Sequence, residues 1–235
     1  TELNGELIAL KNTFDCGSLS DEYLKKMLCI VHYYENLAKA NDCNIISGEC
    51  WTGISLGWGA NPCLAMCLLA DKDVYVTCEW DIHMTITNVL LLSATRGKEK
   101  PIQGEFTCRH PENDNAELLW HCGPFPLKYK APGEKPWLYN TKPSFRLKDG
   151  EYTIARFQAE KGKYYLFADK FHTCEGPKTF GTYMWAQFKD LPKLERKLME
   201  GPYIHHMSEI PGDYTEYFKE FTKYFDEIQF DNAEM

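Results

Sequence analysis

The chain contains no run of about 20 consecutive apolar residues, which is the length that a membrane-spanning helix requires. It also has no excess of basic residues, because 26 Lys and Arg stand against 34 Asp and Glu, for a formal charge of −8. Nucleic acids and anionic membranes attract proteins through basic patches, so we expect neither as a partner. An initiator Met and a secretory signal pattern are missing too, and the starting Thr1 is typical of a processed or trimmed chain.

Internal repeats and low-complexity tracts are absent as well. A chain of 235 residues, with 44% apolar and 26% charged side chains, is typical of one large or two small globular domains. None of the ten cysteines forms a C-x-x-C pair, the spacing of zinc ribbons and redox motifs. A disulfide-rich secreted protein would be shorter and richer in loops. We therefore expect buried free thiols, a reducing environment and a cytoplasmic location.

The N-terminal part shows helices that alternate with short apolar strands. Ser18 and Asp21 resemble a capping box ahead of apolar residues at helical spacing, and Asn61-Pro62 predicts the start of another helix. The apolar runs 43–46 and 74–78 are predicted to be buried strands. Alternating strands and helices of these lengths imply parallel pairing.

A further helix is predicted directly after the second strand. Asp81 is its expected N-cap, and one of its faces is apolar (Ile82, Ile86, Val89 and Leu90). With the preceding elements, this helix completes a partial Rossmann-like α/β layer, which we predict as a first domain over residues 1–100.

After Pro101 the sequence changes to short strands separated by Gly, Pro, Asn and Asp. We predict strands at 102–108, 117–121, 152–157 and 164–171, a hairpin turn at Asp149-Gly150, a proline-rich surface loop at 123–142, and helices at 191–199 and 213–225. This pattern predicts a C-terminal antiparallel β-barrel domain with terminal helices over residues 101–235. The predicted fold class is therefore α/β plus all-β.

Glu79 is the most informative candidate for chemistry. It follows an apolar strand directly, and ligands in open α/β sheets bind beyond the carboxyl ends of strands. The nearby helix N-terminus favours an ionised carboxylate. Helix capping explains Asp81 well, but it does not explain Glu79, which stands before the cap.

Three further candidates lie in the second half of the chain: Glu105, His121 and the pair His205-His206. A lone Glu or His in a strand is more often a structural group than a ligand. If the stretch around the His pair is extended, adjacent side chains point to opposite faces, so at most one imidazole faces a common ligand. Mixed carboxylates and imidazoles are suited to an ion such as Mn²⁺.

In their order along the chain, these motifs resemble the C-terminal half of the L-fucose isomerase and L-arabinose isomerase superfamily. The matching residues are Cys78-Glu79-x-Asp81-Ile82, Gly104-Glu105, His121-Cys122-Gly123 and His205-His206. The resemblance implies a Mn²⁺-dependent aldose–ketose isomerase acting on a monosaccharide. It assigns Glu79 and Glu105 as catalytic, metal-binding carboxylates and His121 and His206 as further metal ligands.

The chain also departs from the family. Family members carry an N-terminal Rossmann-like domain without a counterpart here, so we expect a fragment or a reduced relative. In family oligomers a neighbouring subunit helps to close the sugar site, which implies a homo-oligomer.

Two other functions are considered. A non-catalytic carbohydrate-binding or regulatory domain of the same fold is the alternative, because Trp51, Trp58, Trp80 and Trp120 lie near the candidates in sequence. A thiol-dependent enzyme using Cys78 or Cys122 has little support, since no base stands at a recognisable spacing.

Overall fold

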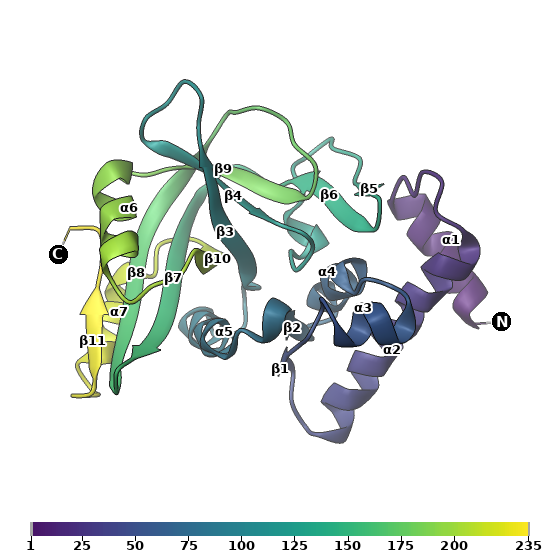
Figure 1. The fold of residues 1–235 in the computed structure, drawn as a ribbon, viewed down its shortest axis with the longest axis horizontal. Coiled ribbons are helices and arrows are strands. Elements are labelled where there is room, and N and C mark those ends of the chain that lie inside the picture. Colours follow the sequence, from purple (N-terminus) through teal and green to yellow (C-terminus); the bar gives the residue numbers. More distant parts are fainter. Residues whose placement is uncertain (1, 235) are drawn as a thin grey trace. The chain divides into compact units, whose positions relative to one another are not determined.

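The computed structural model describes residues 2–234 and divides the chain into two compact units (Figure 1). Unit 1 comprises the chain up to residue 81 together with 121–148 and 178–183. Unit 2 comprises 82–120, 149–177 and the chain from 184 onward. The division into domains 1–100 and 101–235 stays a prediction. Among the described helices, none has the length and apolar character needed to cross a membrane.

Unit 1 combines helices with short strands. Its helices are α1 (Glu2–Thr13), α2 (Asp21–Ala40), α3 (Gly53–Trp58) and α4 (Cys63–Asp71), and its strands are β1 (Ile45–Ser47), β2 (Tyr75–Thr77), β5 (Trp137–Tyr139) and β6 (Lys142–Arg146).

The helix starts in unit 1 follow the expected chemistry with small shifts. The cap of α2 is Ser20 rather than Ser18, because the Ser20 hydroxyl oxygen accepts a hydrogen bond from the Tyr23 N–H at 3.2 Å. α4 begins at Cys63, one residue later than predicted, so that Pro62 is its N-cap residue and the Asn61 side chain does not cap it. That amide bonds instead to the hydroxyl groups of Ser55 and Thr141, at 2.7 and 3.0 Å.

β1 and β2 pair in parallel, as the sequence predicts, with Ile45 opposite Tyr75. The chain leaving β1 stays close to β2, since the Gly48 N–H donates to the Thr77 carbonyl at 2.8 Å. A Cβ at Gly48 would lie only 2.4 Å from Val76 Cγ1, so a larger residue would push the two strand ends apart. This close approach shapes the turn that follows β2.

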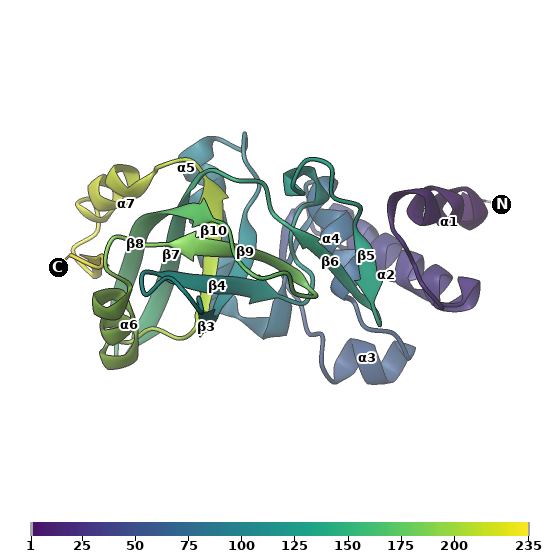
Figure 2. The same ribbon diagram turned by 90° about the horizontal axis from the view of Figure 1, so that it is seen from above.

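Unit 2 is built around a closed six-stranded β-barrel (Figure 2). Its strands follow the order β8, β7, β10, β3, β4, β9, and β9 pairs back to β8. The elements of the unit are β3 (Ile102–Arg109), β4 (Ala116–His121), β7 (Glu151–Glu160), β8 (Lys163–Cys174), β9 (Thr182–Gln187), β10 (His206–Pro211), β11 (Ile228–Asp231), α5 (Ile82–Thr95), α6 (Leu191–Glu200) and α7 (Thr215–Thr222). The predicted fold class, α/β plus an antiparallel barrel, is confirmed.

The longest hairpin of the barrel joins β7 to β8. Its two turn residues, Lys161 and Gly162, have φ values of 50° and 77°, which match the twist of the flanking strands. The prediction of a hairpin at Asp149-Gly150 is wrong, because this segment connects β6 to β7, and these two strands are not neighbours in the strand order. The predicted loop 123–142 also contains β5, so it is only partly loop.

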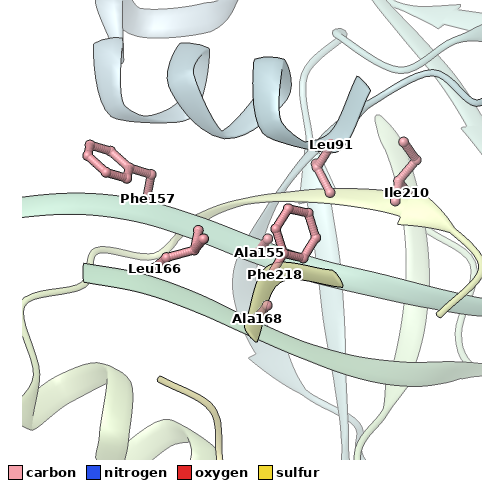
Figure 3. Close-up of a cluster of buried hydrophobic side chains, with 7 residues drawn as sticks. All are labelled: Leu91, Ala155, Phe157, Leu166, Ala168, Ile210 and Phe218. Carbon is pink, nitrogen blue, oxygen red and sulfur yellow. The ribbon is translucent and has the colours of Figure 1, made fainter. Parts of the chain in front are cut away.

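A buried apolar cluster holds α5 and α7 against the barrel. Figure 3 shows Leu91 of α5 and Phe218 of α7 among side chains of β7, β8 and β10 (Ala155, Phe157, Leu166, Ala168 and Ile210). On α5, Thr87 also accepts a hydrogen bond from the Phe157 N–H at 2.8 Å. Most of the apolar face predicted for this helix is exposed, since Ile82 and Val89 are 64% and 46% exposed, whereas Leu90 packs against the cluster.

Candidate functional site

Glu79 lies in a 3₁₀ turn, Cys78–Trp80, that leads from β2 to α5. Glu79 and Trp80 both adopt left-handed backbone conformations, with φ of 63° and 53°. Such conformations cost about 1–2 kcal/mol for residues other than glycine, so the surrounding contacts must maintain them. Two of these contacts are the Trp80 N–H bond to the Gly48 carbonyl, at 3.0 Å, and the Trp51 indole N–H bond to Glu79 Oε1, also at 3.0 Å.

His121 is the last residue of β4 and is buried in unit 1. Its Nδ1 accepts a hydrogen bond from the Cys122 N–H at 2.9 Å, and its carbonyl accepts one from the Thr182 hydroxyl at 3.0 Å. Because Nδ1 accepts the Cys122 N–H bond, the neutral ring carries its proton on Nε2, and a cation can bind Nε2 only when that proton is lost or moved to Nδ1. Within unit 1, a carboxylate oxygen of Glu79 and a ring nitrogen of His121 lie within 4.8 Å of each other.

Glu105 and His206 form the corresponding pair in unit 2. They stand opposite each other on the antiparallel strands β3 and β10, so their side chains share one face. His206 Nε2 lies 3.6 Å from Glu105 Oε2, and His205 Nε2 lies 3.4 Å from the same oxygen. The expectation that only one imidazole reaches this position is wrong, because β10 begins at His206 and strand alternation does not apply to His205.

The two imidazoles of this pair differ in exposure. The side chain of His206 is 7% exposed and that of His205 is 61% exposed. A buried imidazole keeps its orientation better than an exposed one, which favours His206 as a ligand. The structure thus describes two pairs, each within its own unit: Glu79 with His121, and Glu105 with His206.

Sequence reasoning missed a group of four cysteines in unit 1. The Sγ atoms of Cys50 and Cys78 lie 3.2 Å apart, and those of Cys63 and Cys122 lie 3.4 Å apart. One donor atom from each of Cys78, His121 and Cys122 lies within 4.8 Å of the other two. No sequence spacing signals this group, because its members come from distant segments.

The thiols of this group have unequal acidities. Hydrogen bonds toward the Cys122 sulfur from Cys63 and Cys78 lower the pKa of the Cys122 thiol, and His121 lowers it further. The same bonds, together with burial, raise the pKa of the Cys63 and Cys78 thiols. The absence of a base therefore no longer argues against thiol chemistry at Cys122, since His121 is beside it.

No disulfide joins any of the ten cysteines, all of which the structure describes. Five are buried and three are half-buried, which largely agrees with the expected buried thiols, but Cys43 and Cys108 are exposed. Cys43 lies just after the turn that follows α2, and Cys108 lies near the end of β3.

Two further carboxyl groups are buried in unit 2 and were not singled out from the sequence. Burial raises the pKa of Glu209 well above its ordinary value, and a Cβ at Gly104 would lie 2.7 Å from Glu209 Oε1, so the glycine leaves room for this carboxyl. Burial, followed by repulsion from Glu195, raises the pKa of Glu117 to about 7.

An aromatic pocket of about 340 Å³ lies in unit 1. Tyr33, Tyr34, Trp58 and Trp80 contribute to its walls, and Glu49 lies at its edge with its carboxylate bonded to the start of α3. Trp80 directly follows Glu79 in the chain, so the pocket lies next to the turn that carries Glu79.

Comparison with known proteins gives distant relatives. No protein-family model matches the chain. It is 27% identical over 186 residues to a sulfoquinovose isomerase from Alkalicoccus urumqiensis, covering 75% of this chain and 42% of that protein. Sulfoquinovose isomerases from Priestia aryabhattai and Priestia megaterium are 24% identical over 210 residues, covering 86% of this chain and 47% of each protein. The chain spans about half the length of these curated relatives.

Proposed function

We propose that this chain carries the metal-binding residues of an aldose–ketose sugar isomerase that acts on a monosaccharide. The similarity to sulfoquinovose isomerases, over three quarters or more of the chain, supports a sugar isomerase. One observation carries the proposed metal dependence: in each unit, a carboxylate and an imidazole chosen from the sequence have donor atoms close together.

In this proposal Glu79, Glu105, His121 and His206 bind one divalent cation, with Mn²⁺ as the expected ion. Two carboxylates and two imidazoles are a donor set that Mn²⁺ accepts, and both imidazoles are buried, which holds them in place. A bound cation would polarise the sugar carbonyl and make the neighbouring C–H more acidic. The narrower assignment to the L-fucose and L-arabinose isomerase superfamily rests on the order of the motifs.

The protein side chains would then move the protons. One carboxylate, Glu79, accepts the proton from the carbon beside the carbonyl, and its Trp51 hydrogen bond orients it for that step. The other carboxylate, Glu105, moves the hydroxyl proton. His206 helps to position Glu105, since the two groups stand opposite each other on paired strands.

Metal content tests this proposal directly. Mn²⁺ binding would be measured by electron paramagnetic resonance on the wild-type chain and on Glu79→Gln and Glu105→Gln. We expect one tightly bound Mn²⁺ per wild-type chain and at least a tenfold loss of affinity in each variant, since the charged ligand is replaced by a neutral amide of the same shape. Asp81→Asn, which changes a neighbouring carboxylate outside the ligand set, is the matched control. Unchanged Mn²⁺ binding in Glu79→Gln would refute the assignment.

Activity identifies the substrate class. Sulfoquinovose, L-fucose and L-arabinose are the first sugars to assay, because they come from the relatives and from the motif resemblance. Isomerisation of one of them should depend on Mn²⁺ and be lost in Glu79→Gln. A homo-oligomer and a cytoplasmic location stay predictions, which light scattering and fractionation of cells would test.

The aromatic pocket favours a second function, a non-catalytic carbohydrate-binding domain. Tyr33, Trp58 and Trp80 offer the flat apolar surfaces on which sugar rings stack. Calorimetry with the same sugars before and after chelation separates the two functions. A binding domain keeps its sugar affinity without metal, whereas the proposed isomerase needs Mn²⁺ to turn the sugar over.

A further inference from the structure

The four-cysteine group of unit 1 has no role in the function proposed above. We propose that Cys63, Cys78 and Cys122, together with His121, form a second metal site, selective for a thiophilic divalent cation such as Zn²⁺. The proposal does not depend on the isomerase activity.

The donor atoms are already gathered from three separate parts of the chain. Cys63 is the first residue of α4, Cys78 follows β2, and His121-Cys122 lies at the end of β4. The Cys63 and Cys122 sulfurs are 3.4 Å apart, and the donor atoms of Cys78, His121 and Cys122 are mutually within 4.8 Å. Zn–S bonds of about 2.3 Å in a tetrahedron place two sulfurs about 3.8 Å apart. The donors of Cys78, His121 and Cys122 are already close to this spacing, whereas the Cys63 sulfur is close to that of Cys122 and has to move toward the other two donors.

The backbone is shaped to bring these segments together. At Gly123, which follows Cys122, a Cβ would lie 2.5 Å from the Cys63 carbonyl oxygen and 2.7 Å from the Cys63 Cβ. Only glycine allows the chain after β4 to approach the start of α4 so closely. The contact of Cys63 with Cys122 is therefore built into the fold.

The donor chemistry distinguishes this site from the Mn²⁺ site. Thiolates with one imidazole bind Zn²⁺ or Co²⁺ strongly, while Mn²⁺ prefers oxygen ligands. Binding releases the thiol protons to solvent, so affinity for the ion should rise with pH. His121 belongs to both donor sets, and its Nε2 can bind only one ion at a time. Zn²⁺ at the thiols should therefore weaken Mn²⁺ binding.

A simpler explanation is that these cysteines are only small apolar residues of the core. Cys67 illustrates that case: it lies fully buried on α4, and burial is the main cause of its raised pKa. Cys67 is thus a matched control for a buried thiol outside the site. Cys108, exposed in unit 2, is the control for an accessible thiol.

Co²⁺ titration provides the test. The wild-type chain, reduced with a phosphine under anaerobic conditions, should bind one Co²⁺ with a thiolate-to-cobalt charge-transfer band, which oxygen and nitrogen ligands do not produce. Cys78→Ser and Cys122→Ser should lose most of the band, and Cys67→Ala and Cys108→Ser should keep it. Glu105→Gln should keep the band while losing Mn²⁺, which separates this proposal from the proposed function.

A second measurement uses only the wild-type chain, so its outcome does not depend on whether a cysteine variant folds. Mass spectrometry would map alkylation of each cysteine in the wild-type chain, with and without Zn²⁺. We expect Zn²⁺ to slow modification of Cys63, Cys78 and Cys122 at least tenfold and to leave the exposed Cys43 unchanged. Absence of the charge-transfer band in folded wild-type chain, its persistence in folded Cys122→Ser, or equal alkylation with and without Zn²⁺ would overturn the proposal.

Discussion

Replacing Glu117 by Gln should change the dependence of stability on pH. Glu117 lies on β4 and is 7% exposed, and its Oε2 has no hydrogen-bond partner in the described part of the chain. Arg109, the residue opposite it on β3, instead makes a 2.7 Å bond to Glu195. This arrangement, dominated by burial, raises the pKa of Glu117 to about 7.

The direction of the effect follows from proton linkage. The folded chain keeps the proton of Glu117 up to about pH 7, whereas the unfolded chain releases it near the ordinary pKa of 4.5. The folded state is therefore destabilised as the pH rises from about 4.5 to above 7. At about 1.4 kcal/mol per pH unit, the free energy of unfolding should fall by about 2.5 kcal/mol between about pH 5 and pH 8 because of this one group.

Urea unfolding at those two pH values measures the effect. The difference in unfolding free energy, Glu117→Gln minus wild type, should be about 2.5 kcal/mol more positive at the higher pH. Comparing the two pH values removes the constant cost of a buried amide. Glu112→Gln, at an exposed carboxylate on the same hairpin, is the control and should show no such change. If the Glu117→Gln difference is the same at both pH values, the account of this buried carboxyl is wrong.

Two further predictions concern packing. Gly123→Ala should destabilise the chain by about 1–3 kcal/mol in urea unfolding, because the added methyl group would overlap the backbone of Cys63. The control is Gly5→Ala in α1, which should stabilise the chain by about 0.5–1 kcal/mol because the space around Gly5 is open. Equal effects of the two substitutions would contradict the close approach. Phe218→Ala should lower stability by about 3–5 kcal/mol through the cavity left in the cluster of Figure 3, and Phe225→Ala, 42% exposed, should cost far less. A small loss for Phe218→Ala would show that α7 is not anchored by this side chain.

The elements that sequence could predict are those with a strong local pattern. α2 was predicted from the helical spacing of its buried apolar residues, and the parallel strands β1 and β2 were predicted from short unbroken apolar runs. β10 was not, since it buries Ser208 and Glu209 alongside apolar residues, and no alternation marks it as a strand. The buried face of α5 also carries polar residues, such as Thr87 and Asn88, so its apolar pattern indicated the exposed face.

For the candidate site, too, sequence could predict local features but not tertiary contacts. Glu79 could be proposed as a candidate because it lies at the carboxyl end of an apolar strand and helix capping does not explain it. Its left-handed backbone could not, since that depends on contacts with Gly48 and Trp51. The approach of Cys63 to Cys122 is likewise a tertiary contact between distant segments, made possible by the missing side chain of Gly123.

The alternation of segments between the two units limits how this chain can be divided. Each unit is made of three stretches, so the polypeptide passes from one unit to the other five times. Any continuous piece that holds all of unit 1 must reach residue 183, and it then includes residues 82–120 and 149–177 of unit 2. A single truncation of the chain therefore cannot separate one complete unit from the other.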